Sequence, residues 1–381
     1  MTILYVIKYI AQLGGLDRVM TYKMNWLAQH GYEVHLVTYE QGDHPLSFQL
    51  DARIRHTDIG VKLWKKQGRT LPARLRSYFC LRRQFVRQLT AEVLRIDPDV
   101  MVTLTDSYQV TDLLMSIPTR ARRIVESHVE RKAFMKTGDF EGRPLMKWIA
   151  GFYDRRMARY LHRADALVLL TRQDKAQWPD VPQSVVIPNP ITFWPEQVSR
   201  LDNPIVMAAG RLHAQKGFDL LIEAWKHVHA AFPGWQLHIY GDGPDRDMLQ
   251  RQINEAGLAD TISLVPATPD IFEAYREASI FCLSSRYEGY GLVLAEAMST
   301  GVPCVSFNCP YGPADIISDG LDGILVPPMD VKALADGIVR LIDNPALCLQ
   351  LGTAARQHIA RYAPEAIMPQ WERLFAGGLS E

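Results

Sequence analysis

The sequence predicts an α/β protein of two doubly wound domains, each a parallel sheet covered by helices. Short β-rich apolar runs alternate with longer helical patterns along almost the whole chain, as in parallel sheets whose strands are joined by helices. This alternation stops at a proline-rich stretch, residues 187–195, and then starts again, which places a domain boundary near residues 190–203. At 381 residues the chain is long enough for about two domains with separate cores.

The first half contains five predicted strands and two predicted helices. The strands are the apolar runs at residues 3–7, 33–38, 100–105, 123–126 and 166–170. The helices cover residues 17–30 and 71–96, where the longer helical patterns lie. Because strands and helices alternate, we expect the strands to be parallel.

The second half repeats this pattern with six strands. They are predicted at residues 204–209, 236–240, 262–265, 280–283, 303–307 and 323–326. The helices between and after them are predicted at residues 218–229, 245–256, 270–278, 292–300 and 331–343. Residues 364–375 form a final predicted helix with no strand after it. Ligands of such folds bind at the carboxyl ends of the strands.

Composition indicates an ordinary globular protein, with 48% hydrophobic and 22% charged residues. The first apolar run is too short for a signal peptide, and no run reaches the roughly 18 residues of a membrane-spanning helix. We therefore expect a cytoplasmic protein. The five cysteines form no CxxC pair, and Cys282 and Cys304 lie in apolar runs, so we expect buried thiols in place of a disulfide or a zinc site.

The net charge of zero conceals two oppositely charged halves. Residues 1–195 carry 29 Lys and Arg against 19 Asp and Glu, and the remainder carries 13 against 23. The excess lies in residues 62–69 and in the predicted helix 71–96, which holds Arg74, Arg76, Arg82, Arg83 and Arg87, with Trp64, Tyr78, Phe79 and Phe85 interleaved. Such a helix can lie on an anionic membrane surface. The alternative is a solvated face whose arginines pair with acids; nucleic acid is disfavoured because no recognition motif is present.

Residues 285–298 are the most informative stretch of the chain. Gly289 and Gly291 let the backbone turn sharply just before a predicted helix whose N-terminus suits a phosphate. Glu288 precedes this turn, and Glu296 lies one turn inside the helix, where it can accept hydrogen bonds from hydroxyl groups. An acid, a phosphate site and a second acid indicate a nucleotide-sugar site. The alternative is a capped helix with an acid on its exposed side.

Three other segments follow predicted strands and carry candidate residues. Gly15 belongs to a glycine pair after the first strand, where a phosphate or sugar can approach the backbone, although taken alone the pair is better explained by a turn at the strand end. Arg211 and Lys216 lie in residues 210–217, where two cations beside a helix N-terminus suit a pyrophosphate; no Gly-Lys-Ser/Thr follows, so this is not a Walker A loop. His128 follows the strand at 123–126 and is a candidate for binding a sugar hydroxyl.

Together these segments resemble the glycosyltransferase family 4 enzymes, retaining transferases of the GT-B fold, in which two Rossmann-like domains face each other across a cleft. The match is dense between residues 206 and 343. The resemblance implies catalytic roles for Glu288, beside the donor sugar, and His128, near its C6 hydroxyl. It implies donor binding by Gly15, Arg211, Lys216, the amides around Tyr290, Gly291 and Leu292, and Glu296, which binds the ribose.

The resemblance also implies a function and a separate role for each domain. It implies transfer of a hexose or N-acetylhexosamine from a nucleotide-diphosphate sugar, with UDP favoured over GDP, to a hydroxyl acceptor without a metal or cofactor. The acceptor is expected to be a glycan or lipid-linked glycan of bacterial surface polysaccharide synthesis, at the inner face of the cell membrane. Residues 1–195, with 364–381 packed back on them, would bind the acceptor, and residues 196–363 the donor.

Two departures and two alternatives accompany this interpretation. Asp17 stands where many family members have glutamate, and residues 265–268 replace a glycine-bearing turn before the base-binding region. A nucleotide-sugar epimerase or hydrolase of the same fold would form product without an acceptor. A non-catalytic nucleotide-sugar-binding protein would bind the donor without turnover.

Overall fold

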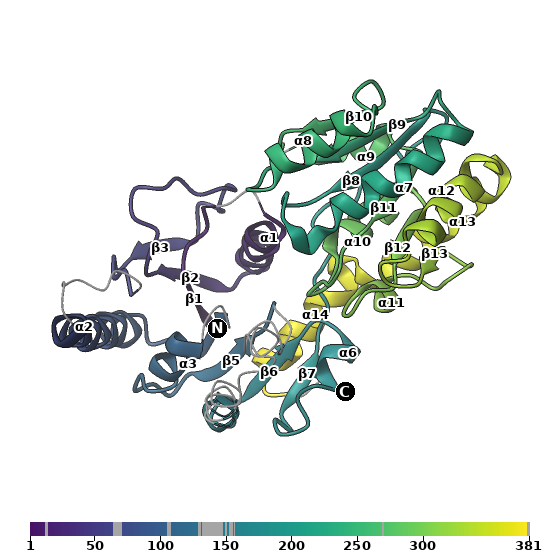
Figure 1. Cartoon of the computed structure of the whole chain (residues 1–381). Coiled ribbons are helices and arrows are strands. Elements are labelled where there is room, and N and C mark those ends of the chain that lie inside the picture. Colours follow the sequence, from purple (N-terminus) through teal and green to yellow (C-terminus); the bar gives the residue numbers. More distant parts are fainter. Residues whose placement is uncertain are drawn as a thin grey trace. The chain divides into compact units, whose positions relative to one another are not determined.

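The computed structural model describes residues 1–11, 14–63, 71–104, 108–128, 131, 148, 151, 155, 157–268 and 270–378. The chain folds into two compact units (Figure 1). Unit 1 comprises Met1–Gln12, Leu16–Ile187 and Gln370–Glu381, and unit 2 comprises Leu13–Gly15 and Pro188–Pro369. The change of unit after Ile187 falls in the proline-rich stretch where the sequence pattern restarts.

Unit 1 is built on a seven-stranded parallel sheet in the order β3-β2-β1-β4-β5-β6-β7. The strands are β1 (Thr2–Ile7), β2 (Glu33–Thr38), β3 (Arg55–Asp58), β4 (Val100–Leu104), β5 (Arg122–Glu126), β6 (Ala166–Leu169) and β7 (Ser184–Val186). All of their pairings are parallel. The central strands are fully buried apolar runs, which is typical of a sheet covered on both faces.

Helices cover both faces of this sheet. The named helices of unit 1 are α1 (Gly15–Gln29), α2 (Leu71–Ile96), α3 (Tyr108–Leu114), α6 (Arg172–Lys175) and the end of α14 (Pro364–Phe375). Phe85 and Leu89 of α2 pack with Leu4 and Val6 of β1 in one core cluster. The α1 helix lies on the other face (Figure 1), where Lys23 of α1 meets Glu126 at the end of β5.

Unit 2 is built on a six-stranded parallel sheet in the order β10-β9-β8-β11-β12-β13. Its strands are β8 (Ile205–Ala209), β9 (Gln236–Tyr240), β10 (Ile262–Val265), β11 (Ile280–Leu283), β12 (Cys304–Phe307) and β13 (Gly323–Val326). Its helices are α7 (Phe218–Ala231), α8 (Arg246–Glu255), α9 (Ile271–Glu277), α10 (Leu292–Ser299), α11 (Pro313–Ile316), α12 (Val331–Ile342), α13 (Pro345–Ile359) and the start of α14, with 3-10 turns at Ala214–Lys216 and Ala360–Tyr362. Strand order reverses between β8 and β11, so the loops after these strands flank the switch point of the sheet.

The predicted α/β fold class is confirmed, and each predicted strand is observed with ends within one residue among the described positions. The sequence analysis omitted β3, β7 and the helices α3, α6, α11 and α13. Cys282 and Cys304 are buried, as expected, and all five cysteines are free thiols, of which only Cys80 is exposed.

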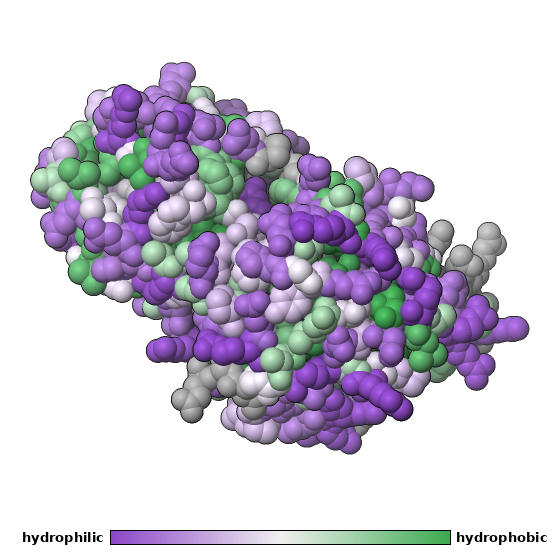
Figure 2. Space-filling model, turned by 180° about the vertical axis from the view of Figure 1, so that it is seen from behind, coloured by the Kyte–Doolittle hydropathy of each residue, from purple (hydrophilic) through white to green (hydrophobic). Residues whose placement is uncertain are grey.

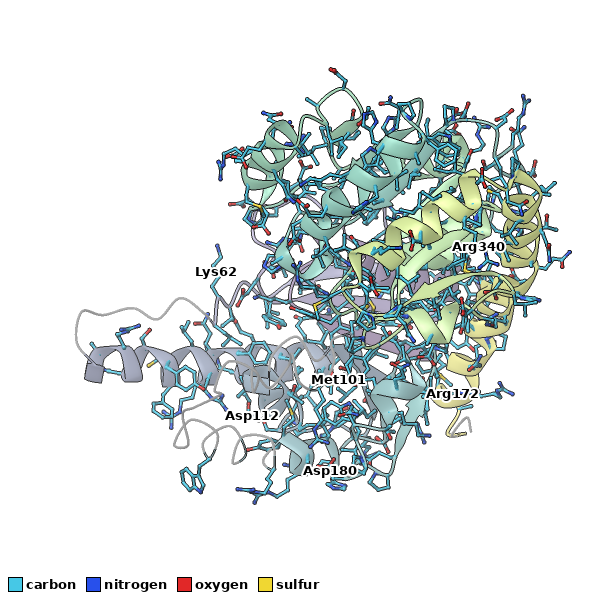
Figure 3. The ribbon with its side chains drawn as sticks, turned by 45° about the vertical axis from the view of Figure 1, so that its right-hand side comes forward. Lys62, Met101, Asp112, Arg172, Asp180 and Arg340 are labelled. Carbon is cyan, nitrogen blue, oxygen red and sulfur yellow. The ribbon has the colours of Figure 1, made fainter. Side chains whose placement is uncertain are left out.

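The interpretation of the basic helix needs two corrections. Phe85 is fully buried in the core of unit 1, so it does not belong to an exposed aromatic face. Arg82 is not free either, because its Nη2 lies 2.6 Å from Asp112 of α3, which Figure 3 labels. Lys62 is exposed and points away from α2 (Figure 3), whereas Trp64 and most of the expected basic stretch 62–69 lie outside the described residues.

The face shown in Figure 2 is mainly polar. Figure 2 shows hydrophobic residues as separate patches among hydrophilic ones on the face in view. Among the described helices, none combines the length and apolarity needed to cross a bilayer.

Candidate functional site

Lys216 and Glu288 meet at the switch point of unit 2. Lys216 ends the 3-10 turn that follows β8, and Glu288 lies in the loop that follows β11. Lys216 Nζ donates to both carboxylate oxygens of Glu288, at 2.7 and 3.0 Å. Their side chains are 18% and 6% exposed. The two residues, 72 positions apart in sequence, therefore form a mostly desolvated ion pair whose lysine retains access to solvent.

Glu288 is held by two further contacts. The Ser285 hydroxyl donates to Glu288 Oε1 at 2.5 Å, and the Glu288 amide donates to the Pro310 carbonyl at 3.0 Å. With Lys216, two side-chain donors therefore face this carboxylate. Because both donors bind the same carboxylate, they fix the position of the Glu288 side chain.

Arg286 joins the two loops that carry this pair. Its guanidinium binds both carboxylate oxygens of Asp219 at 2.8 and 2.7 Å, and Nη1 also donates to the Ala214 carbonyl at 2.7 Å. The Arg286 amide donates to the Gln215 carbonyl, and the Gln215 side chain donates to the Tyr287 carbonyl. Hydrogen bonds from Arg286 lower the pKa of Asp219. The sequence analysis missed both Arg286 and Asp219.

Close backbone packing also joins these loops at Gly217. This residue has a φ of +62°, and a Cβ built on it would lie 2.1 Å from the Ser284 carbonyl oxygen. The Ser284 hydroxyl in turn donates to the Lys216 carbonyl at 2.9 Å. Only glycine fits both the left-handed backbone and the short approach, so the chain reaches Lys216 along a fixed path.

The α10 helix begins beside Glu288 with an open N-terminus. Gly291 is its N-cap, with a φ of +88°, and no side chain caps the helix. The Tyr290 carbonyl is crowded by Gly312, where a Cβ would lie 1.9 Å from its oxygen. The first amides of an uncapped helix point outward with partial positive charge. With no side-chain cap on the helix, the amides of residues 290–292 stay candidates for binding an anion.

The remaining predicted residues of unit 2 have different surroundings. Glu296 is buried in α10, where the Tyr275 hydroxyl donates to it at 2.9 Å. The Tyr290 ring is also buried, and burial raises the pKa of its hydroxyl well above the ordinary value, so only its backbone is suited to ligand contact. Arg211 is exposed and has no ion pair with any described residue. The structure thus joins Lys216 to Glu288 and leaves Arg211 outside the pair.

Two predicted residues follow strands of unit 1. Gly15 is the first residue of α1, after β1. His128 lies two residues beyond the end of β5, and its Nε2 is 2.9 Å from Glu126 Oε1. Among the described residues, no group of three or more His, Cys, Asp or Glu side chains is placed to hold a metal ion.

Family models match both halves of the chain. Residues 14–190 match the family described as "Glycosyl transferase 4-like domain", and residues 191–358 match "Glycosyl transferases group 1". The two matches meet at residue 190, close to the change of unit after Ile187.

Three curated relatives show the same similarity. An uncharacterized glycosyltransferase of Haemophilus influenzae is 28% identical over 97% of this chain and 98% of its own length. The amylovoran biosynthesis glycosyltransferase AmsD of Erwinia amylovora is 29% identical over 97% of this chain and 98% of its own. The exopolysaccharide phosphotransferase SCO2592 of Streptomyces coelicolor is 35% identical over 74% of this chain but only 29% of its own.

Solved structures share the fold. Staphylococcus aureus TarM, determined with fondaparinux, α-GlcNAc-glycerol and UDP, superposes with a TM-score of 0.77 at 16% identity, covering 98% of this chain and 100% of its own. Sucrose-phosphate synthase of Thermosynechococcus elongatus gives 0.78 at 21% identity, covering 99% of this chain and 100% of its own. At such identities the likeness establishes the architecture alone.

Proposed function

Because this chain belongs to the family 4 glycosyltransferases and has their GT-B fold, we propose that it moves a hexose or N-acetylhexosamine from a nucleotide-diphosphate sugar to a hydroxyl acceptor with retention of configuration. The observation that carries the proposal is the contact between Lys216 and Glu288 beside the uncapped α10 helix. It supplies a cation, an anion site and a carboxylate in one place. Relatives named for exopolysaccharide chemistry and for amylovoran biosynthesis support a role in bacterial surface polysaccharide synthesis, for which we propose a lipid-linked glycan as the acceptor.

Departure of the nucleotide places negative charge on the β-phosphate. Lys216, which keeps 18% of its side chain exposed, and the exposed Arg211 would bind the pyrophosphate together with the amides of residues 290–292. These groups stabilise the developing charge without a divalent metal. The proposal takes UDP in preference to GDP as the nucleotide.

Glu288 would orient the donor sugar and stabilise positive charge at its anomeric carbon. Since Ser285 and Lys216 already donate hydrogen bonds to the Glu288 carboxylate, this carboxylate is better suited to electrostatic stabilisation than to covalent attack on the sugar. The acceptor hydroxyl would attack the face from which the phosphate leaves, and the departing phosphate would take its proton. Glu296 would bind the ribose, Gly15 would admit the phosphate to the backbone, and His128 would bind the C6 hydroxyl of the sugar.

The function is tested by the release of nucleotide from UDP-glucose, UDP-N-acetylglucosamine and their GDP counterparts, with and without a lipid-linked glycan acceptor. Glu288→Gln should abolish transfer while keeping the fold, and Glu255→Gln, at an exposed site on α8, is the matched control. Lys216→Met should weaken donor binding more than acceptor binding. Full activity of Glu288→Gln would remove this residue from the site, and loss of wild-type activity on adding a chelator would contradict the metal-independent mechanism.

The same assay separates the alternatives. Product formed from the donor without an acceptor would indicate an epimerase or hydrolase. A nucleotide sugar that raises the melting temperature but is never consumed would indicate a binding protein without catalysis. Either of these two results would contradict the proposed transferase activity.

Acceptor binding is proposed for unit 1, beside an anionic membrane. Arg76, Phe79, Arg83 and Arg87 recur every three or four residues along α2 and are exposed, and Phe79 is 61% exposed. This spacing puts a basic face that includes the apolar ring of Phe79 along the helix. Arg83→Glu/Arg87→Glu should release the protein from phosphatidylglycerol vesicles, whereas Arg251→Glu/Arg340→Glu in unit 2 should not. Equal co-sedimentation of both variants would favour a solvated face.

A further inference from the structure

A fully buried ion pair in unit 1 takes no part in the chemistry described above. Lys23 of α1 and Glu126 at the end of β5 are both 0% exposed, and Lys23 Nζ lies 2.6 and 2.7 Å from the two carboxylate oxygens. Removing two charges from water costs several kcal/mol per ion, which the attraction between them often fails to recover. Well-packed apolar residues would serve the fold as well. The pair therefore calls for a reason other than stability.

Two more side chains complete the cluster. His128 Nε2 is 2.9 Å from Glu126 Oε1, and Lys23 Nζ lies 3.4 Å from the ring centroid of Trp371, on the part of α14 that belongs to unit 1. Glu126 is thus enclosed between a lysine and a histidine. Burial raises the pKa of Glu126, but Lys23 and His128 outweigh it and lower that pKa to about 2. The carboxylate is ionised at neutral pH.

The histidine presents two different sides. Its Nε2 atom is buried, whereas 11% of the side chain remains exposed, so the exposed surface belongs to its other atoms. Nε2 lies within ion-pair range of the Glu126 carboxylate without the alignment of a hydrogen bond. A carboxylate beside Nε2 favours the form of the ring that carries a proton there, since that N–H can donate to it.

We propose that Glu126 is a positioning residue for His128, and that Lys23 keeps the Glu126 carboxylate charged and in place. The ring is held with its proton on Nε2, so that Nδ1 is left as an acceptor for a substrate hydroxyl. This inference rests on the proposed function, in which His128 binds the donor sugar. It gives a function to Lys23 and Glu126, whose burial costs desolvation free energy.

The test replaces the ion pair by apolar side chains of similar size. Lys23→Met/Glu126→Leu removes both charges at once, so no unpaired ion is left in the core. Arg82→Met/Asp112→Leu, which removes the ion pair between α2 and α3, is the control for such an exchange elsewhere in unit 1. The measurements are the ¹⁵N resonances of the His128 ring, which report the proton-bearing nitrogen, and kcat and KM for the donor.

We expect the wild type to carry the proton on Nε2 and the Lys23→Met/Glu126→Leu variant to populate both neutral forms. Its kcat/KM should fall about 10-fold to 100-fold, as for the loss of one hydrogen bond to a charged group, while the control keeps its activity. Lys23→Met alone removes the cation that keeps the carboxylate charged, so it should also weaken the preference of the ring for a proton on Nε2. If the double variant does not fold, Glu126→Gln serves for the same ring measurement because it preserves the shape of the side chain.

Unchanged ring resonances together with kcat/KM within twofold of the wild type would overturn the proposal and leave the pair a purely structural feature. A wild-type protein that transfers no sugar would instead refute the proposed function. The ring measurement needs no substrate, so it still decides whether Glu126 sets the protonated nitrogen of His128.

Discussion

Arg286 offers the sharpest test of how the site of unit 2 is held together. It makes two hydrogen bonds to Asp219 and one to the Ala214 carbonyl, and so ties the loop after β11 to the segment that carries Lys216. The two charged side chains are 31% and 33% exposed, so solvent screens their attraction. We therefore expect Arg286→Ala to lower the free energy of unfolding by only about 1 kcal/mol.

The effect on activity should be much larger than the effect on stability. Without the guanidinium the loop loses three of its anchors near Lys216 and Glu288, and a displacement of about 1 Å in a catalytic site can cost about 100-fold in rate. We expect kcat/KM for the donor to fall about 10-fold to 100-fold. Arg286→Lys keeps the charge but loses the planar fork, so it should recover only part of the activity.

The assay combines chemical denaturation with steady-state kinetics on the nucleotide sugar. Lys226→Ala, which removes the exposed pair with Glu223 on α7, is the matched control and should leave both measurements nearly unchanged. A double-mutant cycle with Asp219→Ala isolates the coupling between the two side chains. If Arg286→Ala kept kcat/KM within twofold of the wild type, the loops would be positioned by other contacts and the reasoning would be refuted.

Three further predictions concern single positions. Gly217→Ala must place a Cβ 2.1 Å from the Ser284 oxygen at a φ of +62°, so it should destabilise by about 2 kcal/mol or more in denaturant titration; Gly234→Ala, in open space, should not. Burial raises the pKa of Asp174 to about 6 in the folded protein. Asp174 therefore stabilises the fold at pH values below its pKa in the unfolded chain, and this contribution is lost as pH rises from about 4 to 6. Asp174→Asn should accordingly raise the melting temperature at pH 7.5 and not at pH 3.5, and equal shifts would contradict this. Ellman's reagent should label Cys80 quickly in the native chain and the four buried cysteines only on unfolding; a second fast thiol would contradict the described burial.

The parts of the fold that follow from side-chain pattern were predictable. Buried parallel strands such as Val100–Leu104 are continuous apolar runs, and their ends were located within one residue. The missed strand β3 is Arg55-His-Thr-Asp, an edge strand of polar residues, and only its pairing with β2 defines it. The missed helix α13 did carry a sequence sign: Asn344 caps it and Pro345 occupies its first turn, which is the preferred pattern of a helix start.

The buried Lys23 shows how a site residue can be overlooked although the pattern contains it. Val19, Met20, Met24 and Leu27 form the apolar stripe of α1, and Lys23 falls within that stripe. A lysine on the buried face of a helix requires a buried acid as partner. The sequence offers several acids near strand ends, and only the sheet order β1-β4-β5 brings Glu126 within reach of α1. Identifying Lys23 as buried was therefore possible from periodicity, whereas identifying its partner required the topology.

The same distinction governs the site of unit 2. That the loops after β8 and β11 are neighbours follows from the restart of the α/β pattern, because a doubly wound sheet reverses its strand order beside the first strand. The sequence alone thus assigns Lys216 and Glu288 to one edge of the sheet. Their contact depends on how two irregular loops pack, through Gly217 against Ser284 and Arg286 against Asp219, 67 residues apart. No periodicity encodes such loop packing, so the residues that hold the site become visible only when the loops are seen together.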